Sequence, residues 1–506
     1  MQVFALVDGN SFFASCEKVF RPDLTDRPVI VLSNNDGCVV ARSKEAKQLG
    51  IKMCQPYFEI DEFCLRENVA VFSSNYELYA NLSGRMMSTI ASQVDCIDPY
   101  SIDECFANMS GYEGLGTDLT QLGFRIKDKV FKDVGIPTCV GIAPTKTLAK
   151  YCNHLAKHYA GLKGVCNWLD LTPQRQAKAL ACEPVSEIWG VGRRYTEHLG
   201  KMGIRTALDL ACADAEAIRD RFGITLSMTV RELQGTSCIP LELVKPKRQQ
   251  IMRSRSFSQL VCDKDDLLGA ITFHAQECGR TLRREGTVAH TVGIVLNTNP
   301  FRLQDVQQHA YPCVGLPYPI SDTNTIIHYA RRLLNQTYRR NCLYKRAGVY
   351  VGEVVPKDAV TKDLFEEPET EQQQIVCELM DSINTRYGKN TLCFAASKLG
   401  KSTWEMSRAR LSPGYTTCWK DLPRIGPLLV KRCRSNRHNA KKNRQESQEA
   451  RLPILYLFIF DYRRPVRTTV IIKSGDKIPI TIRIAQSSQV CTGPALVSCL
   501  AVTFQA

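Results

Sequence analysis

The sequence predicts a multidomain protein of the α+β class. Its length of 506 residues implies several domains. In residues 1–160, short apolar runs typical of strands alternate with amphipathic stretches typical of helices, in an order that suits helices packed on one face of an antiparallel sheet. Residues 241–250, which contain Pro246, look like a linker, and a second series of strands and helices follows them.

The apolar patterns place the elements in order. The first strand is the run Phe4–Val7, which ends at Asp8-Gly9-Asn10-Ser11 before a helical stretch from Phe12. Up to the linker, the patterns predict strands at 28–32, 39–41, 94–97, 100–109 and 138–143, and helices at 43–49, 73–87, 119–134 and 144–157. After it, they predict strands at 251–257, 292–296 and 347–355 and helices at 267–284, 325–338 and 372–387.

Composition narrows the class of protein. Hydrophobic residues make up 44% and charged residues 23% of the chain, as in ordinary soluble proteins. The longest apolar run, 452–460, is too short to span a membrane, and the first residues do not form a signal peptide, so we expect a cytoplasmic protein without membrane contact. The 22 cysteines form no CxxC pair, which favours reduced thiols over a disulfide framework or a zinc site.

The net charge of +15 is unevenly distributed. Residues 424–506 carry +11 of it, from 15 Lys and Arg against 4 Asp and Glu. Residues 241–355 carry +7, from 16 basic and 9 acidic residues, and the rest of the chain sums to −3. The total charge is therefore mostly a property of the last residues, whereas the local excess in 241–355 is what phosphate binding requires.

Three acidic residues are candidates for metal binding. Asp103 and Glu104 are neighbours in a strand-like run, so one of them points where an apolar residue is expected, unless a turn ends the run there. A turn with one buried ion pair is the other interpretation. Asp8 follows a buried strand, where it could also cap a helix or form an Asx turn. Together the three supply oxygen ligands suited to Mg²⁺, and two such ions can hold the attacking and leaving oxygens of a phosphoryl or nucleotidyl transfer.

Several motifs point to one family. They are FALVD at 4–8, FFASCE at 12–17, LSNNDGC at 32–38, SSNYELYA at 73–80 and SIDE at 101–104. With these motifs the sequence resembles the Y-family translesion DNA polymerases, and among them the UmuC-type catalytic subunit of DNA polymerase V, chromosomal or plasmid-borne. The resemblance covers about residues 1–423.

The resemblance implies a right-hand polymerase that carries out error-prone, template-directed DNA synthesis past damage in the SOS response. Its parts would be a palm at 1–24 and 75–168, small fingers at 25–74, a helical thumb with a helix–hairpin–helix at 169–240 and an α/β little finger at 241–355. Residues 356–423 would bind the sliding clamp and partners.

The resemblance also implies roles for named side chains. Asp8, Asp103 and Glu104 would be catalytic and bind two Mg²⁺ ions. The ring of Phe13 would clash with a ribose 2′-hydroxyl and so reject ribonucleotides, and its neighbour Phe12 would pack into the palm. For Phe13, ordinary core packing is the alternative. The nucleotide-binding residues would be Gly9, Phe12, Phe13, Lys44, Lys47, Lys150 and Lys157. Lys47 and Lys157 would contact the triphosphate, although solvated helix faces would show the same lysine spacing.

Expected DNA contacts follow from the same resemblance. Gly190, Gly192 and Arg193 would form a phosphate-binding hairpin, for which an ordinary helix–helix turn is the alternative. Arg253 and Arg255 lie on one face of a predicted strand and would hold template phosphates. Leu364 and Phe365 would bind the beta sliding clamp, in a motif that has Thr361 where the family has Gln. The implied partners are primer-template DNA, dNTP, a UmuD-like processed subunit, a RecA-type recombinase filament and the clamp.

Residues 424–506 look foreign to this family. They contain a basic run at 431–444 and a hairpin-like pattern at 470–484, and our hypothesis is a frameshift or read-through extension. Two other functions remain open for the whole chain. One is a nucleotidyl cyclase, which could use the same carboxylates but would not need surfaces that bind a DNA duplex. The other is a relative that keeps the same folds and binds DNA without catalysis.

Overall fold

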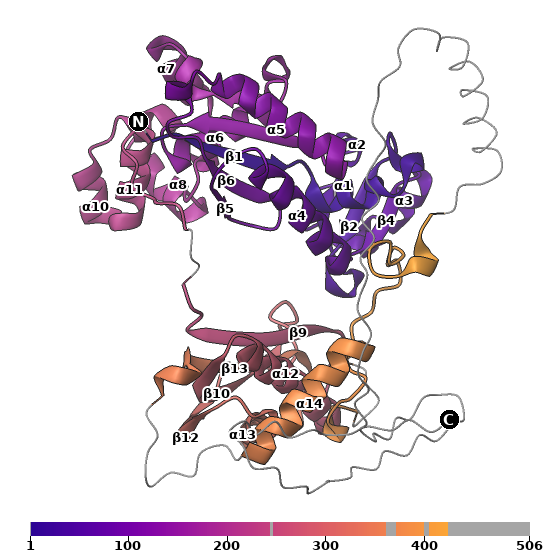
Figure 1. Ribbon diagram of the computed structural model, residues 1–506. Helices are drawn as coiled ribbons and strands as arrows, with labels where there is room; N and C mark the ends of the chain where they lie inside the picture. The colour runs from indigo at the N-terminus through magenta and orange to yellow at the C-terminus, as the bar shows by residue number, and fades with distance from the viewer. Residues whose placement is uncertain (1, 243–245, 361–370, 399–403, 424–506) are drawn as a thin grey trace, which may run out of the picture. The chain divides into compact units, whose positions relative to one another are not determined.

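The computed structural model of the chain describes residues 2–242, 246–360, 371–398 and 404–423 (Figure 1). The expected extension at 424–506 and the expected clamp residues Leu364 and Phe365 lie outside these ranges. Within them, no helix is long and apolar enough to cross a membrane. None of the described cysteines forms a disulfide.

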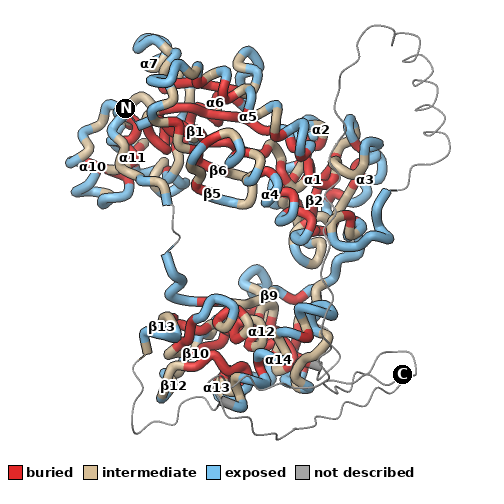
Figure 2. The backbone as a smooth tube through the Cα atoms, viewed as in Figure 1, coloured by how far each residue is buried: buried red, intermediate tan, exposed pale blue. Residues whose placement is uncertain are grey.

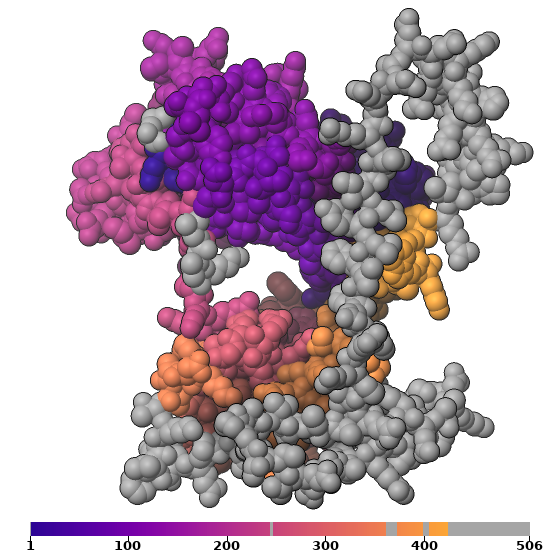
Figure 3. Space-filling view, in the orientation of Figure 1, coloured from indigo at the N-terminus to yellow at the C-terminus, as the bar shows by residue number. Residues whose placement is uncertain are grey.

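A five-stranded sheet forms the centre of the expected palm, with the strand order β5-β6-β1-β7-β8. The strands are β1 Phe4–Gly9, β5 Ile97–Pro99, β6 Glu104–Asn108, β7 Thr138–Ala143 and β8 Val165–Asn167. The helices packed on it are α1 Phe12–Val19, α4 Tyr76–Ala91, α5 Leu119–Val134 and α6 Lys146–His158. The later residues of this part, coloured purple, form a continuous block of surface in Figure 3.

Helices cover both faces of this sheet, so the expectation of helices on one face is wrong. Ala5 and Val7 of β1 join an apolar core with α1, α4 and α5, whereas Phe4 and Leu6 join a second core with α6. The reason is that both alternating sets of side chains on β1 are apolar, and all six residues of this strand are buried. Figure 2 shows the buried residues concentrated along β1, α5 and α6.

Close packing of α6 on β7 depends on one glycine. A Cβ atom on Gly141 would overlap the backbone oxygen of Ala149 and the backbone nitrogen of Asn153, and it would lie 2.8 Å from the carbonyl carbon of Cys152. The side chain of Asn153 then bonds across the contact, because its Nδ2 donates to Leu6 O at 3.1 Å and to Cys139 O at 2.8 Å. The helix is thereby held at a fixed height over the sheet.

A three-stranded sheet with the order β3-β2-β4 occupies the expected fingers. Its elements are β2 Val29–Leu32, β3 Val39–Arg42 and β4 Ala70–Ser73, with α2 Lys44–Gln48 and α3 Asp61–Arg66. The helix expected at 73–87 begins later, at Tyr76, because Ser73 ends a strand and the side chain of Asn75 accepts a hydrogen bond from Leu78 N.

A group of helices follows in the region of the expected thumb. They are α7 Pro173–Cys182, α8 Arg193–Lys201, α9 Ala207–Ala211, α10 Ala215–Phe222 and α11 Ile224–Leu233. Their apolar side chains share one core with α6 and with the Phe4 and Leu6 face of β1. The helices and the palm sheet are therefore one packed body.

The expected little finger is a second sheet with helices on one side. Its strands are β9 Gln250–Val261, β10 Thr287–Thr298, β11 His309–Ala310, β12 Cys313–Ile320 and β13 Tyr344–Pro356. The sheet has the order β11-β10-β13-β9, and β12 also pairs with β10. The helices are α12 Lys264–Arg284 and α13 Thr323–Thr337.

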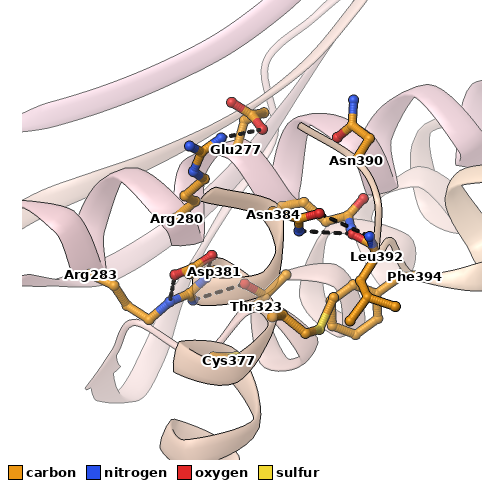
Figure 4. Close-up of a pocket in the computed structure, with 12 residues that line it drawn as sticks. Glu277, Arg280, Arg283, Thr323, Cys377, Asp381, Asn384, Asn390, Leu392 and Phe394 are labelled. Carbon is orange, nitrogen blue, oxygen red and sulfur yellow. Dashed lines mark hydrogen bonds and ion pairs between the residues drawn. The ribbon is translucent and has the colours of Figure 1, made fainter. Parts of the chain in front are cut away.

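Helix α14, Glu371–Tyr387, lies against α12. Figure 4 shows the contact, in which the Arg283 guanidinium of α12 pairs with both carboxylate oxygens of Asp381 at 2.7 and 3.1 Å. The same guanidinium donates to Ser321 O and to Thr323 Oγ1. After α14, the chain contributes Trp404 to the core of the second sheet and Tyr415 to the core of the palm.

Candidate active site

Two of the three acidic residues lie directly opposite each other on paired strands. Asp8 of β1 is the register partner of Glu104, the first residue of β6. Directly opposed residues of an antiparallel pair point to the same face of the sheet, so these two carboxylates project together. Asp103 immediately precedes the strand, and its carbonyl oxygen accepts a hydrogen bond from Gly9 N at 2.8 Å. The fold thus brings all three expected carboxylates to one end of β1 and β6.

A bend sets the position of Asp103. The strand expected at 100–109 starts only at Glu104, and residues 101–103 form the bend. Ser101 Oγ accepts hydrogen bonds from Asp103 N at 3.2 Å and Glu104 N at 3.0 Å, and it donates to Asp103 Oδ1 at 2.6 Å. Because Asp103 lies in the bend and not in the strand, its side chain need not point to the face opposite that of Glu104.

Helix α6 supplies a lysine to each of three carboxylates. Lys157 Nζ lies 2.7 Å from Asp8 Oδ2, and Lys150 Nζ lies 2.8 Å from Glu104 Oε1. Lys146 pairs with Asp98 at 2.7 Å, with side chains only 4% and 6% exposed. The ammonium groups of Lys146 and Lys150 are therefore both paired with carboxylates.

The environment of Asp8 disfavours an isolated negative charge. Burial raises the pKa of Asp8 to about 7, while the charge of Lys157 opposes the rise and Glu104 adds to it. A carboxylate held in this way gains from any additional positive charge placed beside it. This is the electrostatic condition of a cation site.

The donor set fits Mg²⁺. Oxygen atoms from Asp8, Asp103 and Glu104 are the ligands that this ion takes, and Mg²⁺ leaves further positions for substrate phosphates. Within the described ranges, no three His, Cys, Asp or Glu side chains already stand in a metal-binding arrangement. The lysine contacts account for this, because Lys157 and Lys150 pair with the carboxylates of Asp8 and Glu104.

A second set of positive charges lies beside these carboxylates. Burial and the nearby charges of Arg42 and Lys157 lower the pKa of Lys47, whereas the charge of Asp8 acts in the opposite direction. Lys47 therefore lies within electrostatic range of both Lys157 and Asp8. Lys44 is exposed and lines a cavity of about 530 Å³ with Asn10 and Ser11.

The turn from β1 into α1 places the two phenylalanines differently. Phe12 is buried in the palm core, so its ring packs as expected and has no surface to offer a nucleotide. The Phe13 ring stacks on Tyr79 with centroids 4.5 Å apart and planes 15° apart. Ser11 between β1 and α1 has a φ of 47°, and a Cβ on Gly9 would lie 2.9 Å from the Phe12 ring. Glycine at position 9 therefore lets the chain turn tightly here.

The thumb glycines lie at the start of α8. Gly190 has a φ of 89°, which favours glycine, and Gly192 is the N-cap of α8. Arg193 is exposed and pairs with Glu197 one turn along the helix. The expected turn between two helices is instead a turn that follows a short 3-10 segment, Val185–Glu187.

Arg253 and Arg255 share a face of β9, as their spacing predicts, but this face is covered by helices. They pair in register with the buried residues Val349 and Ala347. Arg253 donates to Thr281 Oγ1 of α12, and the Arg255 guanidinium lies 5.7 Å from the centroid of Phe273. The opposite face carries Arg346, which bonds to Ser254 Oγ at 2.7 Å.

Three residues of these sites were given no role by sequence reasoning. Tyr79 lies in a quoted motif, one helical turn from Tyr76, and that spacing could have placed it beside an aromatic partner. Arg42 ends β3 two residues before Lys44, and Arg346 occupies the outward position of a strand. The last two carry no sequence signal beyond their charge.

Comparisons with known proteins identify the family of the chain. Residues 7–154 match the impB/mucB/samB family, residues 248–364 match the C-terminal domain of that family, and residues 376–425 match a domain of unknown function. Protein UmuC of Salmonella typhimurium is 42% identical over 426 residues, which cover 84% of this chain and all of that protein. Protein MucB of Escherichia coli is 40% identical over 423 residues, which cover 83% of this chain and 99% of MucB.

Among solved structures, a Y-family DNA polymerase chimera superposes with a TM-score of 0.55 at 19% identity, over 70% of this chain and 99% of the other. The fold is therefore that of a Y-family DNA polymerase. With the identities to UmuC and MucB, the chain belongs to the impB/mucB/samB family, the UmuC type of these polymerases. It is an error-prone DNA polymerase for translesion synthesis, an activity that depends on metal ions in this class.

Proposed function

We propose that Asp8, Asp103 and Glu104 hold two Mg²⁺ ions for nucleotidyl transfer onto a primer 3′-hydroxyl. The observation that carries the proposal is the direct opposition of Asp8 and Glu104 across β1 and β6, with Asp103 at the end of the same strand pair. When bound, the ions lower the pKa of the attacking hydroxyl and neutralise the leaving pyrophosphate. The carboxylates would thereby fix where the primer 3′-oxygen bonds to the α-phosphorus as the bond to the leaving pyrophosphate breaks.

The lysines would change partners when a nucleotide arrives. Lys157 stabilises the Asp8 carboxylate in the free protein and is one-third exposed, so it is free to move to the triphosphate. Lys47 lies close enough to join it. Lys150 stays on Glu104, where its ammonium also lies 4.9 Å from the ring centroid of Tyr100. This arrangement supplies charge to the phosphates without moving the helix.

Phe13 is proposed as the residue that selects deoxyribose. Its ring is half-buried, rigidly stacked on Tyr79 and next in the chain to a buried neighbour, Phe12. A fixed ring of this kind would clash with a 2′-hydroxyl and not with a deoxyribose, so the energetic cost falls on the wrong substrate. Gly9 keeps the turn tight enough for this placement.

For DNA, we propose phosphate contacts at the start of α8, where Gly190, Gly192 and Arg193 present backbone N–H groups and an exposed guanidinium that would exchange Glu197 for a phosphate. In the second sheet, Arg346 on the face away from the helices is a better placed contact than the two arginines of β9. Arg253 and Arg255 would have to reach past the edge of their strand.

The proposed partners are a UmuD-like processed subunit, a RecA-type recombinase filament and the beta sliding clamp, the last through Leu364 and Phe365. The unpaired cysteines support a cytoplasmic location. One observation supports the frameshift hypothesis for residues 424–506. A relative such as ImpB is matched over 99% of its own length, whereas the match covers only 83% of this chain. Translation of the other frames beyond Pro423 would test it.

Primer extension tests the proposed chemistry. The full chain with its partner subunits is given dNTP and Mg²⁺ on undamaged and lesion-bearing templates, beside Glu104→Gln. Loss of an acidic ligand is expected to lower the rate by at least about 100-fold, as for a group that stabilises transition-state charge. The control is Glu113→Gln, in a short exposed turn, which should extend normally. Full activity of Glu104→Gln would refute the assignment.

A further inference from the structure

A segment near residue 412 returns from the second sheet to the palm and fingers. Ser73 N at the end of β4 donates to Arg410 O at 2.9 Å, and Arg410 N donates to Ser73 Oγ at 3.0 Å. Tyr415 is buried and stacks on Phe20, with ring centroids 4.8 Å apart. Figure 1 shows this segment in light orange beside β4. We name residues 410–415 the C-terminal strap.

The strap reaches a buried acid through one hydroxyl. Ser412 is 5% exposed, and its Oγ donates to Glu17 Oε1 of α1 at 3.2 Å. Asn75, the N-cap of α4, donates from Nδ2 to the same Ser412 Oγ at 2.9 Å. Ser412 therefore links the last turn of α1 to the N-cap of α4, through two residues that lie 58 positions apart in the sequence.

Glu17 is an unusual residue for a helix packed inside the palm. It is 1% exposed, and burial raises its pKa to about 7. Its Oε1 accepts from Tyr79 O–H at 2.6 Å as well as from Ser412, whereas Oε2 has no hydrogen-bond partner. A buried acid with one unsatisfied oxygen destabilises the fold, so an apolar side chain would serve packing better.

The position of Glu17 explains why an acid stands there. The Tyr79 hydroxyl that it accepts from belongs to the ring on which Phe13 stacks. A short hydrogen bond to a fixed acceptor sets the rotation and depth of the Tyr79 ring, and the stacked Phe13 ring follows it. An unbroken series of contacts thus runs from Ser412 through Glu17 and Tyr79 to Phe13.

We propose that Glu17 and Ser412 are positioning residues for the Phe13 ring. Through them, the C-terminal strap would hold in place the ring that selects deoxyribose over ribose. This assigns a task to a part of the domain of unknown function matched at 376–425. The inference rests on the proposed role of Phe13. If the strap only anchored the chain, its substitution would change dNTP and rNTP incorporation by the same factor. A change in the ratio of the two therefore tests the inference.

The test compares incorporation of dNTP and rNTP by the full-length protein with its partner subunits. Ser412→Ala and Glu17→Met remove the contacts, and each is expected to lower the ratio of kcat/KM for dNTP over rNTP by about tenfold, as for loss of a hydrogen bond to a charged group. Glu17→Gln keeps an acceptor oxygen and should retain most of the ratio. Thr417→Ala, an exposed residue of the same region, is the matched control and should leave it unchanged.

The outcomes separate the inference from the proposed function. If Phe13→Ala raises rNTP use and Ser412→Ala does not, the strap has no role in sugar selection and the inference is overturned. If Phe13→Ala leaves rNTP use unchanged, the assignment of Phe13 is wrong and the inference falls with it. Deuterium exchange of residues 70–82 gives a readout apart from activity. Ser412→Ala should speed exchange at the Tyr79 turn of α4, and unchanged exchange would also count against the inference.

Discussion

Substitution of Gly141 by alanine tests how the fold positions the lysines that pair with Asp8 and Glu104. Gly141 of β7 faces the backbone of α6 so closely that a Cβ would overlap Ala149 and Asn153 and lie 2.8 Å from the carbonyl carbon of Cys152. Ordinary contact begins near 3.4 Å, so the helix and the strand must separate by about 1 Å. Nothing flexible lies between them, because the atoms in the way are backbone atoms.

The cost follows from packing and hydrogen bonds. Overpacking of a close core contact costs roughly 1–3 kcal/mol. Separation of α6 also weakens the two bonds from Asn153 Nδ2 to Leu6 O and Cys139 O, each worth about 1 kcal/mol. We therefore expect Gly141→Ala to lower the free energy of unfolding by about 3 kcal/mol. Since α6 carries Lys150 and Lys157, a displacement of about 1 Å should lower kcat/KM roughly 100-fold.

Urea unfolding and primer extension measure the two effects. The matched control is Gly84→Ala, in the interior of α4, where an added Cβ meets no atom within 4 Å. Alanine is the better helix former there and should raise stability by about 0.5–1 kcal/mol without loss of activity. If Gly141→Ala were as stable and as active as the wild type, α6 would not be held by this contact and the reasoning would be refuted.

Three further predictions concern stability and chain length. Lys146→Met leaves Asp98 buried without its partner and should lower stability in urea by about 3–5 kcal/mol, whereas the exposed Lys132→Met should be neutral. The pKa of Glu17 is raised from 4.5 to about 7, so the folded state binds the proton more tightly; stability should rise as pH falls from 8 to 5, and Glu17→Gln should flatten this dependence. A chain that ends at Pro423 should extend primers and bypass lesions at least as well as the full chain, and an inactive truncation would contradict the frameshift hypothesis.

Local sequence signals predicted the elements of the palm well. The helix expected at 119–134 has those bounds because Asp118 caps its start and Gly135, with a φ of 80°, ends it. The strand expected at 138–143 is β7, because its six residues are apolar or small and a polar turn follows. The three carboxylates were chosen as candidates on local patterns too, since a buried strand that ends in an acid and two adjacent acids in a strand-like run are both unusual.

Features that depend on tertiary contacts could not be read from the sequence. Alternation along β9 shows that Arg253 and Arg255 share a face, but only the register with β13 shows that helices cover this face. The contact between Ser412 and Glu17 joins residues 395 positions apart, and no local sequence pattern predicts it. The pairing of three lysines with three carboxylates likewise requires the height of α6 above the sheet, which Gly141 sets.

The number of divalent ions bound at the carboxylates tests the central claim most directly. Mn²⁺ serves as the probe, titrated by electron paramagnetic resonance into the full chain with primer-template DNA and a non-hydrolysable dNTP. We expect two ions at the site in the wild type and fewer in Asp103→Asn/Glu104→Gln, with DNA binding retained. Two ions bound with unchanged affinity in that variant would show that Asp103 and Glu104 are not the metal ligands, and the account of the active site would be wrong.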